Sequence, residues 1–164
     1  MINAKKFIPE TFLKLTSNTY PNGYEDMVAD YMLELGLFTK DVCRDVHGNY
    51  FLNIGDSRTI FASHLDTVSK EHRVVNHVVN GKMISTDGTT TLGADDKAGV
   101  VIMLYMIKKN IPGMYYFFMG EEVGCIGSGL VSKNEDIEGK YDRIISFDRR
   151  GTCLLYTSPS PRDR

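Results

Sequence analysis

The apolar run 114–118 is followed at once by two adjacent acids between glycines, in the stretch Met119-Gly120-Glu121-Glu122-Val123-Gly124. Adjacent side chains of an extended segment point to opposite faces, so both acids can serve one site only if the backbone turns here. The two glycines permit that turn. Two carboxylates at the end of a buried strand repel each other unless they share a proton or bind a cation. The stretch therefore favours a shared proton or a cation site at the end of a central strand.

Other residues that can bind a hard cation also stand at the ends of predicted strands and loops. They are His64 and Asp66, the pair Asp95-Asp96, and Asp148. Taken singly, such a residue is more often a helix cap, a turn acid or a salt-bridge partner. In open α/β sheets, however, sites are assembled at the carboxyl ends of the strands. The recurrence of these residue types at strand ends therefore indicates one shared site.

Composition excludes several classes of function. The chain has 164 residues, of which 42% are hydrophobic, enough for one domain with a core. The formal net charge of −2 argues against nucleic acid or an anionic membrane as a partner. No apolar stretch is long enough to span a membrane, and residues 1–10 do not have the pattern of a signal peptide, so we expect a cytoplasmic protein. Cys43, Cys125 and Cys153 form no disulfide or zinc-knuckle pattern and are expected to be packing residues.

Hydrophobic periodicity predicts an alternation of strands and helices. The predicted helices are 7–16, 24–35, 98–107 and 126–132. The predicted strands are 41–46, 50–54, 59–63, 73–79, 82–85, 114–118 and 143–147. Asn22 is expected to cap the second helix and Gly36 to end it, while Asn80-Gly81 predicts a hairpin turn. The fold class predicted from this order is α/β, with a mixed, mostly parallel sheet flanked by helices.

The candidate residues suit a pair of metal ions. In an extended segment His64 and Asp66 project to the same side, so Asp66 can accept the second ring N–H of His64 while the other ring nitrogen faces a metal. The carboxylate of Asp95 can bridge two cations about 3.5–4 Å apart, as in dinuclear hydrolases. Glu122 and Asp148 would then add one oxygen ligand to each ion. Imidazole with carboxylates suits zinc first, with cobalt or manganese as alternatives.

The remaining acid, Glu121, is the candidate general base for a water activated by the two ions. Hydrolysis of an amide needs both an activated water and a polarised carbonyl, and two ions can supply both. The residues alone do not decide which of Glu121 and Glu122 is the base and which is the ligand, because either could turn inward.

Three blocks of the sequence also resemble a known family. They are HLDT at 64–67, GADDKAG at 93–99 and GEEVGCIGS at 120–128. They look like the metal-site blocks of the dinuclear zinc exopeptidases, the superfamily of peptidase T, the aminoacylases, the glutamate carboxypeptidases and related aminopeptidases. The similarity also takes in Gly23-Tyr24-Glu25 and the turn from Asp45 to Asn49, and it spans about residues 20–151.

The resemblance implies a role for each site residue. It implies that His64 and Asp148 bind the first ion, that Asp95 bridges both ions and that Glu122 binds the second. It further implies that Asp66 orients His64 and that Glu121 is the general base. A cis peptide bond between Asp95 and Asp96 is expected on the same grounds.

One departure from the family pattern affects the expected activity. The family completes its second ion with a histidine near the C-terminus, and no histidine follows His77 in this chain. Residues 153–164 resemble a translated sequencing-adapter tail, and their composition predicts disorder. We therefore expect residues 1–152 to be the N-terminal part of a metallopeptidase catalytic domain, with the chain itself inactive and the parent protein a hydrolase.

The leading functional hypothesis is a zinc-dependent aminopeptidase acting on short peptides, with no nucleic-acid or membrane partner and with oligomerisation possible through missing regions. An N-acyl amino acid deacylase or a carboxypeptidase would use the same metal site with a different pocket. A non-catalytic metal-binding or peptide-binding domain is a third alternative, which the free acid Glu121 argues against, because a protein that only holds metal has no use for it.

Overall fold

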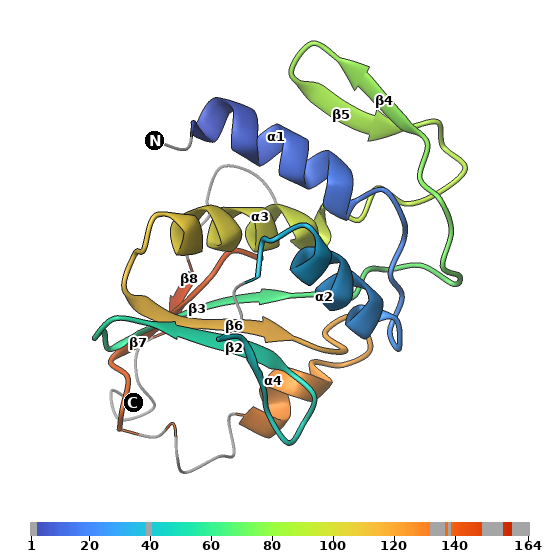
Figure 1. Cartoon of the computed structure of the whole chain (residues 1–164). Helices are drawn as coiled ribbons and strands as arrows, with labels where there is room; N and C mark the ends of the chain where they lie inside the picture. Colours follow the sequence, from blue (N-terminus) through green and yellow to red (C-terminus); the bar gives the residue numbers. More distant parts are fainter. Residues whose placement is uncertain (1–2, 39–40, 132–136, 138, 149–155, 159–164) are drawn as a thin grey trace.

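The computed structural model describes residues 3–38, 41–131, 137, 139–148 and 156–158 (Figure 1). The helices are α1 (Ala4–Leu15), α2 (Glu25–Glu34), α3 (Ala94–Lys108) and α4 (Ile126–Val131). The strands are β1 (Cys43–Arg44), β2 (Tyr50–Ile54), β3 (Thr59–His64), β4 (His77–Asn80), β5 (Met83–Thr86), β6 (Gly113–Phe118), β7 (Arg143–Ser146) and β8 (Tyr156–Ser158).

The main sheet has the strand order β1-β2-β6-β3-β7-β8. Three of its four inner strands, β6, β3 and β7, run parallel, whereas β1, β2 and β8 join by antiparallel pairing. All six residues of β3 are buried, as expected for a strand covered on both faces. The predicted α/β class with a mixed sheet flanked by helices is therefore confirmed.

The core divides over the two faces of this sheet. On one face Tyr115 and Phe117 of β6 belong to a cluster with side chains of α1, α2 and α3, including Val28 and Leu104. On the other face Tyr116 packs with Ile60 and with Val131 of α4. Figure 1 shows the same division, with α1 and α3 on one side of the sheet and α4 on the other. This alternation follows from the two-residue period of a strand.

The second helix begins differently from the prediction. Its N-cap residue is Tyr24, whose side chain makes no capping hydrogen bond. The predicted cap, Asn22, instead donates from Nδ2 to the Glu25 carboxylate at 3.0 Å. Because the helix starts at Glu25, Asn22 lies two residues before the cap position and its side chain acts there as a donor to Glu25. Gly36, at a φ of +62°, follows the end of the helix as predicted.

Both predicted hairpins are present. In the first, β1 is shorter than predicted and pairs with β2 through Cys43 and Arg44. The second hairpin forms a separate two-stranded sheet of β4 and β5. Asn80 pairs with Met83, so the turn comprises Gly81 and Lys82, one position later than predicted.

The structure differs from the predictions for the cysteines and for residues 153–164. Cys43 and Cys125 are exposed, so neither is a packing residue: Cys43 lies in the short edge strand β1 and Cys125 in the loop just before α4. Cys153 and most of the predicted disordered tail lie outside the described residues. Tyr156–Ser158 is described as a strand, because the edge of β7 offers unpaired backbone groups to a β-favouring segment.

Among the described residues, no helix combines the length and apolar character needed to cross a bilayer.

Candidate metal centre

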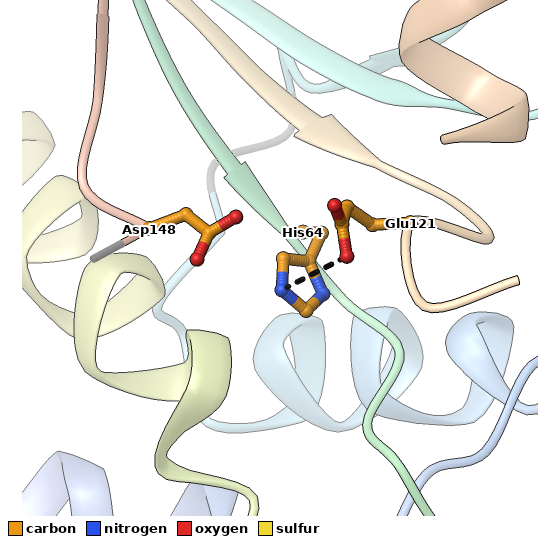
Figure 2. Close-up of side chains that lie close together, drawn as sticks. All are labelled: His64, Glu121 and Asp148. Atoms are coloured by element: carbon orange, nitrogen blue, oxygen red, sulfur yellow. Dashed lines mark ion pairs between the residues drawn. The ribbon is translucent and has the colours of Figure 1, made fainter. Parts of the chain in front are cut away.

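The candidate ligands gather at one edge of the sheet, where the parallel strands end. His64 is the last residue of β3, the two glutamates follow β6, and Asp148 follows β7. Asp95 lies in the first turn of α3. In Figure 2 the side chains of His64, Glu121 and Asp148 point toward a common space. Parallel strands bring their carboxyl ends to the same edge, which explains how residues distant in sequence meet.

His64 is the centre of this arrangement and is only 2% exposed. Its Nδ1 lies 3.0 Å from the main-chain oxygen of Asp66 and 3.2 Å from the Asp66 carboxylate, so Nδ1 carries a proton and donates it. Its Nε2 lies 3.2 Å from Oδ1 of Asp95 and 3.9 Å from Oε2 of Glu121. The predicted contact between His64 and Asp66 is therefore present, and Nε2 is the ring nitrogen that faces the acids.

The acids around His64 determine its charge. Burial by itself would lower its pKa, but the hydrogen bond to Asp66 and the negative charges of Asp96 and Asp66 raise the pKa of His64 to about 9. Without a metal ion the imidazole is therefore protonated at neutral pH and acts as the cation among the carboxylates.

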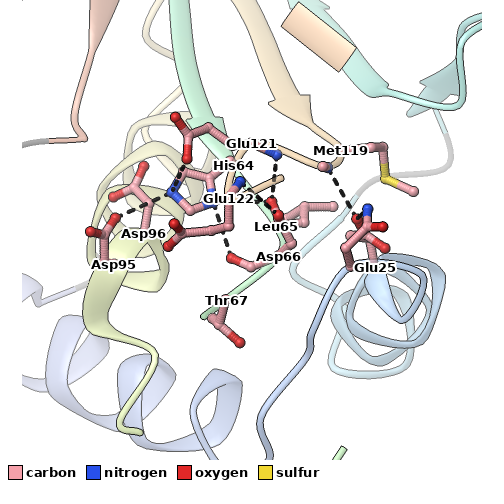
Figure 3. Close-up of polar contacts among 12 residues, drawn as sticks. Glu25, His64, Leu65, Asp66, Thr67, Asp95, Asp96, Met119, Glu121 and Glu122 are labelled. Atoms are coloured by element: carbon pink, nitrogen blue, oxygen red, sulfur yellow. Dashed lines mark hydrogen bonds and ion pairs between the residues drawn. The ribbon is translucent and has the colours of Figure 1, made fainter. Parts of the chain in front are cut away.

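Asp66 is fully buried and forms hydrogen bonds with both His64 and the backbone of the two glutamates. Its two carboxylate oxygens accept the backbone N–H of Glu121 at 3.0 Å and of Glu122 at 2.9 Å (Figure 3). Burial acts to raise the pKa of Asp66, but the hydrogen bonds from His64 and from these two backbone groups lower it below its ordinary value. Asp66 is therefore ionised and connects the ends of β3 and β6.

The backbone turns at the glutamates, as their flanking glycines predicted. Gly120 has a φ of +61° and Gly124 a φ of +112°. A Cβ on Gly120 would also lie 3.0 Å from Nδ2 of Asn22. Because of this turn, both Glu121 and Glu122 face the same site although they are adjacent in sequence.

The two aspartates at the start of α3 have different environments. Asp95 has a side chain that is 71% exposed, whereas Asp96 is buried and accepts hydrogen bonds from the hydroxyl of Ser63 and the N–H of Gly99. Burial raises the pKa of Asp96 to about 6, although both hydrogen bonds lower it. The peptide bond between the two aspartates is cis, as the resemblance implied.

Two groups of side chains are close enough to bind an ion. One comprises His64, Glu121 and Asp148, the other His64, Asp95 and Glu122, and in each group the possible ligand atoms lie within 4.8 Å of one another. Ligands at about 2.0–2.2 Å from a zinc ion lie at most about 4 Å apart, so a small inward movement of the side chains would suffice. Imidazole nitrogen and carboxylate oxygen are also a donor set that zinc, cobalt and manganese accept.

The mutual repulsion of the acids also favours binding of a cation. Burial raises the pKa of Glu122, and the charges of Asp95 and Glu121 raise it further. Burial likewise raises the pKa of Asp148, again with contributions from Asp95 and Glu121. The residues therefore carry more negative charge than one protonated imidazole balances, and divalent ions would relieve this repulsion.

All the sequence-predicted site residues thus come together: the five candidate donors His64, Asp95, Glu121, Glu122 and Asp148 converge, with Asp66 behind His64. The grouping of Glu121 with His64 and Asp148 means that Glu121 could itself bind an ion. Because Nδ1 of His64 is engaged by Asp66, His64 can bind one ion only, through Nε2. Any second ion would therefore rely on carboxylates among the described residues.

Three buried polar residues near the site were not assigned a role from sequence. They are Glu25, Asn49 and Lys97. Burial lowers the pKa of Lys97 to about 8, while the negative charges of Asp66, Asp96 and Glu25 act to raise it. Its Nζ donates to the main-chain oxygen of Leu65, between the two ends of the His64–Asp66 segment. Each of the three lies in a stretch that resembles the family, and that similarity was the signal that could have identified them.

No protein-family model matches this chain. A curated relative, the uncharacterised protein YqjE of Bacillus subtilis strain 168, is 32% identical over 98% of this chain and 48% of its own length. The crystal structure of a tripeptidase from Staphylococcus aureus matches with a TM-score of 0.70 and 29% identity, over 92% of this chain and 45% of that one. That of the aminopeptidase PepT from Bacillus cereus matches with a TM-score of 0.70 and 27% identity, over 92% and 44%.

The chain thus spans about half the length of these relatives. Two of the three are peptidases by name, and both share with this chain the fold that carries the site. The comparison therefore supports peptidase function in general.

Proposed function

We propose that this chain belongs to the dinuclear zinc exopeptidase superfamily and that the protein containing it is a metal-dependent aminopeptidase that hydrolyses short peptides. The observation that carries the proposal is the convergence of one imidazole and four carboxylates at the ends of β3, β6 and β7 and the start of α3. The names of the tripeptidase and the aminopeptidase support the substrate class.

The residues that would hold the ions are His64, Asp95, Glu122 and Asp148. Bound divalent ions would supply a Lewis acid for the scissile carbonyl and favour the ionised form of water at neutral pH. Asp66 serves this site by holding Nδ1 of His64, so that the lone pair of Nε2 faces the acids once its proton is lost.

Glu121 is the residue we propose to move protons. Its Oε1 accepts a hydrogen bond from the Cys125 thiol at 3.3 Å, which leaves Oε2 as the oxygen nearer His64. Oε2 would take a proton from the attacking water and then give it to the departing amine. With its side chain 30% exposed, Glu121 can reach substrate while its backbone is held by Asp66.

A groove beside the site has room for a short peptide. Its volume is about 950 Å³, and Glu122 and Val123 form part of its wall together with Tyr24, Arg73 and Thr90. Groove and candidate metal centre share Glu122, so a peptide lying in the groove would extend from the site. This size is typical of pockets that bind small ligands.

The decisive test replaces Glu121 by glutamine in the protein that contains this chain. We expect hydrolysis of di- and tripeptides to fall by about 10²–10⁴-fold, the contribution of a general base, while the bound metal measured by elemental analysis is unchanged. The matched control is Glu122→Gln, which should lose metal and activity together.

Other results for the Glu121→Gln variant would contradict its role as the base. Loss of metal in the Glu121→Gln variant would make Glu121 a ligand, and unchanged turnover would remove it as the base. A panel of free peptides, N-blocked peptides and N-acyl amino acids separates the alternatives, because an aminopeptidase needs a free amino group. Hydrolysis of only the blocked or acylated compounds would contradict the aminopeptidase assignment.

A further inference from the structure

The four consecutive backbone N–H groups that follow β6 each donate a hydrogen bond to a buried side chain from elsewhere in the chain. Asn49 accepts from Met119 at 3.1 Å, and Glu25 accepts from Gly120 at 3.1 Å. Asp66 accepts from the two glutamates that follow. Asn49, Glu25 and Asp66 are each at most 1% exposed. The backbone that carries the glutamate pair is therefore held at every residue by groups shielded from water.

Glu25 holds the residue immediately before Glu121. Its Oε1 accepts from Gly120 and from Nδ2 of Asn22, and its Oε2 accepts the N–H of Gly23 at 2.6 Å. Both oxygens are thus used, as a buried carboxylate requires. Figure 3 shows Glu25 beneath the turn, on the side away from His64 and Asp95. Among the described residues, Glu25 belongs to neither group of candidate metal ligands.

Glu25 itself is fixed in place by the core. It lies in the first turn of α2, whose Val28, Ala29 and Met32 are fully buried. Its hydrogen bond to Gly120 spans 95 residues of sequence and joins this helix to the turn that carries the glutamates. The position of Gly120 is therefore set by a packed helix, through a carboxylate that cannot move into solvent.

We propose that Glu25 is a positioning residue for Glu121: by fixing the Gly120 peptide it sets the direction in which the Glu121 side chain enters the site. The proposal rests on the proposed function, in which Glu121 moves the proton. Gly120 has a positive φ and no side chain, so without an acceptor its peptide can rotate more freely than that of any other residue type. Rotation there displaces Glu121, and a misplacement of about 1 Å can cost about 10²-fold in rate.

The test compares Glu25→Gln with Asp26→Asn in the protein that contains this chain. Both variants change an acid to its amide in the first turn of α2, but Asp26 accepts from Tyr50 and Arg44 and is half exposed. The amide introduced by Glu25→Gln offers one acceptor and one donor where Gly120 and Gly23 both donate, so one of the two backbone groups loses its partner. Glu25→Asp, which keeps the charge but shortens the side chain, is the milder variant if Glu25→Gln does not fold.

We expect kcat to fall by about 10–100-fold in Glu25→Gln, with KM and metal content within about twofold of wild type, because the proton-transferring group is displaced and the ligands are not. In the metal-free protein, the amide of Gly120 should exchange with solvent at least about tenfold faster. Asp26→Asn should leave all four quantities unchanged.

A double-mutant cycle separates positioning from general damage. In a Glu121→Gln background, adding Glu25→Gln should cost no further kcat, because the group it positions is already absent. An additive loss, a parallel loss of metal, or an unchanged Gly120 exchange rate would each overturn the proposal. Failure of the proposed function would appear separately, as full activity of the single Glu121→Gln variant.

Discussion

The buried carboxylate of Asp66 lies 3.2 Å from Nδ1 of His64 while its two oxygens accept the backbone N–H groups of Glu121 and Glu122. One side chain thus orients the candidate imidazole ligand and fixes the backbone of both glutamates. A change at Asp66 should therefore affect metal binding and the turn together.

Replacement of Asp66 by asparagine tests this double role. The amide keeps one acceptor oxygen but presents an NH₂ group to a backbone N–H, so one buried donor loses its partner at a cost of about 1–3 kcal/mol. Weaker orientation of His64 should reduce metal affinity by about 10–100-fold. Urea unfolding and metal titration measure the two effects. Asp142→Asn, which alters an exposed ion pair with Arg58, is the control and should change neither by much; equal effects in both variants would contradict the assignment.

The stability of the metal-free protein should depend on pH through His64. Its pKa rises from 6.5 to about 9 on folding, so the folded state binds the proton more tightly. This contribution is fully present below pH 6.5 and is lost as the pH rises through 9, with a magnitude on the order of 1–3 kcal/mol. Thermal unfolding between pH 6 and 10 should show the decline in wild type and a smaller one in His64→Gln. Parallel curves for the two proteins would refute the contribution of His64.

Divalent ions should stabilise the folded state. An ion that binds only the folded protein adds about 2.7 kcal/mol at a concentration 100 times its Kd. We therefore expect zinc, cobalt or manganese to raise Tm, and a chelator to reverse the change. His64→Gln should abolish most of the shift, whereas His47→Gln, in the turn before β2 and outside both candidate ligand groups, should retain it. An equal shift in the two variants would place the bound ion elsewhere.

Gly120→Ala should destabilise the turn that presents the glutamates. A non-glycine residue at its φ of +61° costs about 1–2 kcal/mol, and the new Cβ would also meet Nδ2 of Asn22 at 3.0 Å. The control is Gly129→Ala in α4, where a Cβ meets nothing within 4 Å and alanine favours the helix. Denaturant unfolding should thus give opposite signs for the two variants, and similar stabilities would contradict a requirement for glycine at position 120.

Much of the site could be predicted because its signals are local. An apolar run such as 114–118 identifies a buried strand, and an acid or histidine directly after it, such as Asp148 or His64, must lie at the strand's end. The glycines on either side of the glutamate pair likewise predicted the turn. The errors were local as well: Asn22 does not cap α2, because the helix starts at Glu25 and leaves Asn22 two residues before the cap position, where its Nδ2 donates to the Glu25 side chain.

The sequence by itself therefore determined the fold class, the edge of the sheet at which the site lies and the residue types that meet there, since these follow from periodicity and from the positions of strand ends. Only the tertiary structure decided which buried groups hold the site together. The bonds from Glu121 to Asp66 and from Gly120 to Glu25 span 55 and 95 residues. Such contacts depend on how packed elements face one another, and no spacing along the chain encodes that geometry.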